Sequence, residues 1–344
     1  MIAVRCVALA VLLALTLLEA QASVLRRDLD LLNQRLHGRV VDLTNNHGQD
    51  RRLWSSALQQ YRDMYVYLPP GFDPERRYPL ALFLHGAVQD EQFFLDVVER
   101  FDQAMAAGEQ KPAILAAPDG SIPGRPAFYP PTSIFVNSRV GRFEDYLMGD
   151  VWNYLCTAYP VLPQREAHAL IGVSMGGMAA FTHGIQRRDR FKLILGFFPA
   201  LNMRWVDGQG HYHSKFNPHS WGWRMRFGPN ELFGRAKLVA IRFPMLLDPL
   251  FGQGAEAIAR LSAINPIELL DRCEVKQGDL DMYIAYGGRD EFNIDTQVES
   301  FLYRARERGL KVGIDYDPQG RHDVATGLKL LPGAMRWVAT HMCR

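Results

Sequence analysis

Residues 169–181 contain a short apolar run, a serine between two glycines, and a second apolar run. The run 169–172 is typical of a buried strand, and the run 178–181 is typical of the start of a helix. The turn between them, Gly172-Val173-Ser174-Met175-Gly176-Gly177, has the G-x-S-x-G spacing of a sharp strand-to-helix turn. Backbones approach closely in such a turn, so a side chain at Gly172 or Gly176 would collide there. The pattern therefore indicates an α/β fold in which Ser174 lies between a strand and a helix.

Short apolar runs alternate with amphipathic segments along most of the chain. The other predicted strands are 64–68, 80–84, 113–117, 193–198, 282–286 and 312–316. The other predicted helices are 24–36, 93–107, 143–159, 296–308 and 334–341. Continuously apolar strands that are separated by amphipathic helices are typical of a parallel sheet with helices on both faces. We therefore expect an α/β fold with a mostly parallel central sheet.

The first 22 residues have the pattern of a cleavable signal peptide. Arg5 supplies a positive charge, residues 7–18 are apolar apart from one threonine, and Ala20-Gln21-Ala22 provides a small-x-small cleavage site. An uncleaved N-terminal anchor is the alternative, although the apolar stretch is short for a membrane span. No later segment has the length and apolarity of a membrane span. We expect a secreted or periplasmic protein with a polar lead-in at 23–62 and one α/β domain at 63–344.

Charge and cysteine content restrict the expected partners and covalent structure. Lys and Arg total 39 and Asp and Glu total 37, which gives a formal net charge of +2. Nucleic acid binding requires a concentrated positive face, and the arginine pairs of this chain are scattered, so we expect no nucleic acid partner. Cleavage after residue 22 leaves Cys156, Cys273 and Cys343, which allow at most one internal disulfide. The sequence leaves the choice of pair open.

The segment 202–264 interrupts the alternation of strands and helices. It is rich in aromatic residues, namely Trp205, Tyr212, Phe216, Trp221, Trp223, Phe227 and Phe233. A long insertion after the C-terminal end of a strand is positioned to cover a substrate as a lid. It can equally form a small satellite core that packs on the sheet, and one segment can have both roles. Tryptophan offers a flat amphipathic face, so Trp221 and Trp223 are candidate contacts for a carbohydrate or lipid substrate.

A serine hydroxyl becomes an effective nucleophile when an imidazole accepts its proton and a carboxylate fixes the tautomer of that imidazole. In folds with this serine turn, the acid and then the histidine follow the serine along the chain, in loops after strands. Asp290 lies in the loop after the strand 282–286 and is the predicted acid. Glu291 and Asp295 are rivals, although they are better explained as charges at the start of the helix 296–308.

The predicted general base is His322. It lies in the loop that follows the last strand, 312–316, where the chain order requires the histidine. His168, His183 and His341 lie outside such a loop and are interpreted as structural.

An oxyanion is stabilised by two backbone N–H groups that point at the developing charge. Met175, the residue after the serine, is expected to supply one of them. Ala87, in the loop after the strand 80–84, is expected to supply the other, and Gly86 allows the chain to turn there.

Three histidines in the insertion, His211, His213 and His219, raise the question of a metal site. No carboxylate or cysteine stands at a helpful spacing from them, so we interpret them as solvated loop residues. Hydrolysis by Ser174 and His322 needs no metal. We therefore expect neither a metal nor another cofactor.

Several segments together carry a family resemblance, and they are Tyr65–Phe72, Tyr78–Leu80, His85-Gly86, Ala117–Gly120, Phe143–Leu147, Gly172–Gly177, Asn265-Pro266, Gly288–Asp290 and Gly320–His322. In this order they resemble the putative-esterase branch of the α/β-hydrolases, which includes feruloyl esterases, S-formylglutathione hydrolases, enterochelin esterases and mycolyl acyltransferases. The resemblance covers about residues 55–340. It implies the α/β-hydrolase fold, a Ser174–Asp290–His322 triad and no cofactor. The segment 202–264 is longer than in compact members of the family, so the substrates of the family do not transfer.

The leading functional hypothesis is a secreted serine hydrolase that cleaves a carboxylic ester through an acyl-enzyme on Ser174. An acyltransferase would use the same three residues with an alcohol in place of water as the acceptor. A non-catalytic binding domain on the same fold is the third possibility, although such domains usually lose one of the three residues. The substrate is expected to be an ester of a small molecule, a carbohydrate or a lipid.

Overall fold

The computed structural model describes residues 29–122, 132–236 and 239–342. The predicted signal peptide at 1–22 and Cys343 lie outside these residues. None of the described helices combines the length and the apolarity that a membrane span requires. Cys156 and Cys273 are free thiols, so they are not joined to each other.

Eight strands form one central sheet in the order β1-β4-β6-β5-β9-β10-β15-β16. They are β1 (Arg39–Leu43), β4 (Met64–Leu68), β6 (Ile114–Pro118), β5 (Leu80–Leu84), β9 (His168–Val173), β10 (Leu193–Phe197), β15 (Asp281–Gly287) and β16 (Val312–Asp317). All neighbours from β6 to β16 are parallel, and only β1 and β4 run antiparallel to their neighbours. The expected mostly parallel sheet is confirmed.

The edge strand β1 lies within the segment 23–62, which we expected to be a polar lead-in before the α/β domain. It pairs with β4 along its whole length, with Val41 opposite Val66. Its exposed and buried residues alternate, because β1 is an antiparallel edge strand. A run of five residues with two charges, Arg39 and Asp42, carries little of the apolar signal that identified the central strands.

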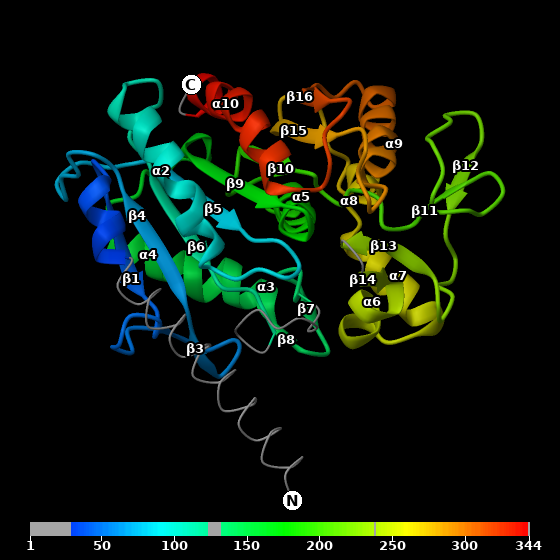
Figure 1. Ribbon diagram of the computed structural model, residues 1–344, viewed down its shortest axis with the longest axis horizontal. Helices are drawn as coiled ribbons and strands as arrows, with labels where there is room; N and C mark the ends of the chain where they lie inside the picture. The colour runs from blue at the N-terminus through cyan, green and yellow to red at the C-terminus, as the bar shows by residue number, and fades with distance from the viewer. Residues whose placement is uncertain (1–28, 123–131, 237–238, 343–344) are drawn as a thin grey trace, which may run out of the picture.

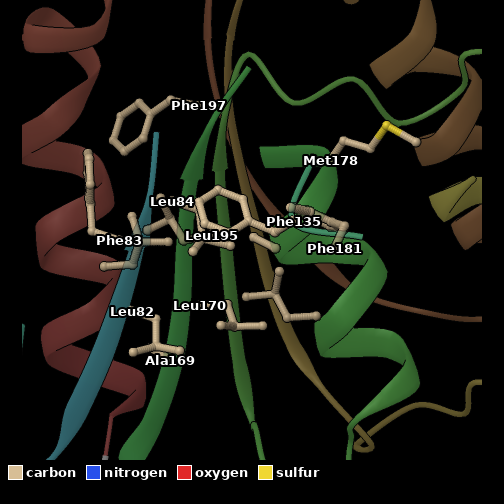
Figure 2. Close-up of a cluster of buried hydrophobic side chains, with 14 of the residues drawn as sticks. Leu82, Phe83, Leu84, Phe135, Ala169, Leu170, Met178, Phe181, Leu195 and Phe197 are labelled. Carbon is tan, nitrogen blue, oxygen red and sulfur yellow. The ribbon is translucent and has the colours of Figure 1, made fainter. Parts of the chain in front are cut away.

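Helices cover both faces of the sheet. They include α2 (Phe93–Ala106), α5 (Met175–Gln186), α8 (Pro266–Arg272), α9 (Ile294–Glu307) and α10 (Val324–His341), and a helix precedes β1 at residues 29–35. Figure 2 shows Phe83 and Phe197 on the face beside α10, whereas Phe181 projects from α5 onto the opposite face. There Phe181 meets Phe301 of α9 edge to face, with ring centroids 5.4 Å apart.

The predicted helix 143–159 is divided into three parts. These are α3 (Phe143–Asp145), a π-helical turn (Tyr146–Val151) and α4 (Trp152–Ala158). In the π-turn, Asp150 accepts hydrogen bonds from the hydroxyl of Ser55 at 2.6 Å and the backbone of Ala57 at 2.9 Å. A wide turn of this kind changes which residues face the core, so helical periodicity did not reveal the division. Small elements nearby are β2 (Leu53–Ser55), β3 (Gln60–Arg62), β7 (Asn137–Ser138), β8 (Gly141–Arg142) and the 3-10 turn Arg165–Ala167.

The insertion after β10 lies beside the central sheet, on the right of Figure 1. It contains β11 (Trp205–Asp207), β12 (Trp221–Trp223), β13 (Leu232–Ala236), β14 (Val239–Arg242), α6 (Phe243–Phe251) and α7 (Gly254–Ile264). Trp205, Tyr212 and Phe233 are buried, so these aromatic residues form a satellite core. The Tyr212 hydroxyl donates to the Phe292 carbonyl at 2.6 Å, which ties this core to the loop after β15.

The start of α5 packs directly against β5 and β9. A Cβ atom on Gly176 would overlap the carbonyl oxygen of Leu84 at the end of β5. A Cβ atom on Gly172 would overlap the backbone of Gly176 itself. Both obstacles are backbone atoms, which cannot rotate aside as a side chain can. The two glycines therefore allow strand β9 to turn into α5 beside β5, as the sequence predicts.

Gly176→Ala tests this close approach. We expect the free energy of unfolding to fall by about 3 kcal/mol or more, because the added Cβ overlaps the backbone carbonyl oxygens of Leu84 and His85. Urea unfolding followed by circular dichroism measures this change. Gly149→Ala is the matched control: an added Cβ there has open space, so its stability should be unchanged or higher by up to about 1 kcal/mol. Equal stability of the two variants would contradict the account of the turn.

Candidate active site

Ser174 lies between β9 and α5 with φ 56° and ψ −116°. A residue with a side chain adopts this conformation only when its surroundings hold it there. The Ser174 N–H donates to the carbonyl of Phe197 at 2.8 Å, and the N–H of Met178 donates to the Ser174 carbonyl at 3.0 Å. These bonds to β10 and α5 hold the turn, so the Ser174 side chain projects from a rigid part of the molecule.

The loops after β15 and β16 bring Asp290 and His322 to Ser174. His322 Nε2 lies 3.0 Å from the Ser174 hydroxyl, and its Nδ1 lies 2.7 Å from Asp290 Oδ2. An ionised carboxylate only accepts hydrogen bonds, so Nδ1 carries the proton and Nε2 is the acceptor that faces Ser174. The three predicted residues therefore form one hydrogen-bonded chain, although 148 positions separate Ser174 from His322.

Asp290 is held in place on its other side as well. Its side chain is only 1% exposed, and Oδ1 accepts the N–H of Phe292 at 2.8 Å. The His322 ring in turn lies beside two phenylalanines, with centroids 5.2 Å from Phe198 and 4.9 Å from Phe292. The imidazole is thus fixed by one carboxylate and two aromatic rings.

The two rival carboxylates have different positions. Glu291 accepts the backbone N–H of His322 at 3.0 Å and forms an ion pair with Arg321, so it holds the histidine loop and not the ring. Asp295 lies in the first turn of α9, and burial raises its pKa to about 6. Sequence reasoning placed Glu291 at a helix start and missed this bond, because the partner loop is 31 residues away.

The loop after β5 lies against Ser174. A Cβ atom on Gly86 would be 3.6 Å from Cβ of Ser174. The carbonyl of Gly86 accepts the N–H of Gln89 at 3.3 Å and lies 2.9 Å from Nδ1 of His85. In a trans peptide the N–H points opposite to the carbonyl, so these bonds also fix the direction of the Ala87 N–H. Met175 is the first residue of α5, and its N–H has no carbonyl partner within that helix.

His85 is a residue whose role the sequence analysis missed. Its Nε2 accepts the N–H of Gly120 at 2.8 Å, so Nδ1 carries the proton and donates to the Gly86 carbonyl. Burial lowers the pKa of His85 to about 4, which keeps the ring neutral and this tautomer in place at neutral pH. The available sequence signal was a histidine at the end of a buried strand, directly before the glycine of the loop.

The two tryptophans that are candidate contacts for a carbohydrate or lipid substrate lie in the insertion. They belong to β12, which Figure 1 shows at the outer edge of the molecule, apart from α5. Trp221 stacks on the buried Trp205, and Trp223 is 39% exposed. The structure therefore does not bring them to Ser174; the aromatic residues beside His322 are Phe198 and Phe292, which the sequence analysis did not single out.

The remaining histidines have local partners. His168 lies between the carbonyls of Arg190 and Leu162, and His183 contacts the carbonyl of Phe135 at 2.8 Å. In the insertion, His211 lies 3.4 Å from Asp207. Within the described ranges, no group of three or more His, Cys, Asp or Glu side chains is arranged to hold a metal ion.

The fold has well-defined counterparts among solved structures. A ferulic acid esterase superimposes with a TM-score of 0.63 at 17% identity, covering 89% of this chain and 99% of that one. An S-formylglutathione hydrolase from Agrobacterium tumefaciens gives 0.63 at 15% identity, covering 89% and 96%. A fluorophosphonate-binding serine hydrolase from Staphylococcus aureus gives 0.60 at 16% identity, covering 88% and 98%. At these identities the likeness establishes the α/β-hydrolase fold.

Comparison of the sequence with models of protein families identifies the family as well as the fold. Residues 55–327, well over half of the chain, match the model of a family described as "Putative esterase". The matched range includes Ser174, Asp290 and His322. The chain therefore belongs to the putative esterase family and has the α/β-hydrolase fold.

Proposed function

We propose that Ser174, His322 and Asp290 form the catalytic triad of a carboxylesterase. The observation that carries the proposal is the hydrogen-bonded chain from Asp290 Oδ2 through His322 to the Ser174 hydroxyl, with links of 2.7 and 3.0 Å. Both distances lie within the reach that proton transfer requires. The strained backbone of Ser174 and the buried carboxylate are what a preorganised nucleophile and its orienting acid need.

The proposed reaction proceeds through an acyl-enzyme. His322 Nε2 accepts the Ser174 proton as the serine oxygen attacks the ester carbonyl, and the resulting imidazolium is stabilised by Asp290. The imidazolium then protonates the leaving alcohol, and the ester bond breaks to leave the acyl group on Ser174. A water molecule deprotonated by His322 attacks this acyl-enzyme. Release of the carboxylic acid restores Ser174.

The N–H groups of Met175 and Ala87 are the proposed oxyanion donors. Met175 is supported by its place at the start of α5, where the helix dipole also favours negative charge. Ala87 is supported by the approach of Gly86 to Ser174 and by the two groups that hold the Gly86 carbonyl, His85 and Gln89. His85 and Gln89 are positioning residues in this proposal, since they act through the peptide between Gly86 and Ala87.

The insertion is the proposed wall of the substrate pocket. Phe292 packs on the His322 ring, and Phe233 of the insertion packs on Phe292 with centroids 5.5 Å apart. This contact places residues of 202–264 one aromatic layer from the reacting atoms, which suits a covering segment. The exposed Trp223 offers a flat face for a carbohydrate or lipid portion of a larger ester, away from the bond that is cleaved.

The proposal includes export of the enzyme. It is supported by Arg5, the apolar run 7–18 and the small-x-small site Ala20-Gln21-Ala22. The proposed mature chain begins at Ser23 and acts in the periplasm or outside the cell.

Substitution of the two neighbouring carboxylates tests the proposed acid. We expect Asp290→Asn to lower kcat on p-nitrophenyl acetate by about 10³–10⁴-fold, because the amide no longer fixes the required tautomer. Glu291→Gln is the matched control. Its amide oxygen can still accept the His322 N–H, so kcat should stay within about tenfold of the wild type. Similar losses in both variants, with thermal unfolding unchanged, would contradict the assignment of Asp290.

Two replacements of His85 test its positioning role. The glutamine amide reaches the position of Nε2, where its oxygen can accept the Gly120 N–H, but it places no donor at the position of Nδ1. The shorter asparagine amide reaches the position of Nδ1, where its NH2 can donate to the Gly86 carbonyl, but it places no acceptor at the position of Nε2. We expect His85→Gln to lower kcat by about 10–100-fold with little change in KM, because the Ala87 N–H loses its direction. His85→Asn should retain more of kcat and lose more stability. Equal kcat values for the two folded variants would rule out this role.

A further inference from the structure

The two edge strands of the central sheet, β1 and β16, differ in whether their outward backbone groups are hydrogen-bonded. At the β1 edge, the Asn33 side chain donates to the Val40 carbonyl at 3.0 Å and accepts the Val40 N–H at 2.7 Å. This carboxamide occupies the backbone groups that another strand would use. At the opposite edge, no strand of the described residues pairs with the outer side of β16. One edge is therefore closed by a side chain, while the other is a regular strand with a free side.

Hydrogen bonds at the end of β16 show which of its backbone groups face outward. The Asp317 carbonyl accepts the Gly288 N–H at 2.9 Å, so Asp317 directs its backbone toward β15. Successive residues of a strand direct their N–H and C=O groups to alternate sides. Val312, Ile314 and Tyr316 therefore direct theirs away from β15, to the free edge. The pairing of β16 with β15 is continuous from Val312 to Asp317, without a bulge that would twist this edge away.

Two of these three residues also have exposed side chains. Ile314 is 51% exposed and Tyr316 is 45% exposed, while Val312 is half-buried. The alternation of a strand places all three on the same face of the sheet. Gly313 and Asp315 lie on the other face, where α10 packs through Trp337 and Gly333. An edge strand that combines free backbone groups with an apolar stripe is a template for pairing with another chain.

We infer that β16 pairs with β16 of a second copy of this chain, antiparallel about a two-fold axis through Ile314. In this register Ile314 faces its own copy and Val312 faces Tyr316, so the apolar stripe continues across the interface. Each opposed pair of outward residues exchanges two hydrogen bonds. The two central sheets join into one, and both copies use the same surface, as a closed two-fold dimer requires.

Charge complementarity supports the second copy as the partner. On the α10 face, the register places Lys311 opposite Asp317 of the other copy, at both ends of the paired segment. The Asp317 carboxylate already contacts Lys329 of its own chain at 2.6 Å, so Lys311 would extend an existing ion pair. Gly313 lies opposite Asp315, so no like charges meet directly. A shift of the axis to Asp315 would place this carboxylate against its own copy. In the register with the axis at Ile314, β16 pairs over its full length with β16 of the second copy, and the facing side chains are complementary.

The oligomeric state and one charge substitution test the interface. We expect analytical ultracentrifugation of the wild type to show a dimer that dissociates on dilution. Ile314→Lys places two ammonium groups at the axis and should give a monomer with unchanged circular dichroism. Leu31→Lys is the matched control, since Leu31 is 52% exposed on the helix before β1 and should leave the dimer intact. A monomeric wild type, or a dimer that survives Ile314→Lys, would overturn the proposal.

Cysteine cross-linking tests the register in a background in which Cys156, Cys273 and Cys343 are all replaced by serine. Opposed residues in a hydrogen-bonded pair have Cα atoms about 5.5 Å apart, which is within disulfide range. Ile314→Cys should therefore give a covalent dimer under mild oxidation. Val312→Cys should not, because the two copies of residue 312 are offset by about 14 Å along the strands. Faster cross-linking of Val312→Cys than of Ile314→Cys would overturn this register.

Discussion

The organisation of the active site depends on one close backbone approach, where α5 begins against the end of β5. Gly172 and Gly176 have no room for side chains there, and Ser174 between them has a φ of 56°, a value that residues with side chains rarely adopt. The same contact brings the loop after β5 to the serine, with Gly86 beside Ser174 Cβ. One packing constraint thus sets the position of the proposed nucleophile and of the second proposed oxyanion donor, before any catalytic hydrogen bond forms.

The remaining parts of the site follow from the direction of the parallel strands. β5, β9, β15 and β16 all end at the same edge of the sheet, so the loops that carry Gly86, Ser174, Asp290 and His322 converge there. Each functional group is then fixed by a partner that does not react. Glu291 holds the backbone of His322, Phe292 N–H holds Asp290, and neutral His85 holds the Gly86 carbonyl. The insertion adds an aromatic layer behind Phe292.

Sequence reasoning anticipated the features that depend on local pattern and chain order. The limits of β4 and β5 were predicted without error because these strands are buried on both faces and stopped by turn residues. Ser174, Asp290 and His322 were chosen from chain order, and the structure places them within hydrogen-bonding distance. Contacts between distant segments were not accessible in this way. The role of His85 depends on Gly120, that of Glu291 on the His322 loop, and the positions of Trp221 and Trp223 on how a hairpin packs.

The central claim is that Ser174 is an activated nucleophile whose reactivity depends on His322. Labelling of the purified protein with a fluorophosphonate probe, followed by peptide mapping, tests it most directly. The account predicts a single modified residue, Ser174, and loss of labelling in the His322→Ala variant while the fold is retained. Labelling at another serine, or undiminished labelling of Ser174 in His322→Ala, would contradict the account.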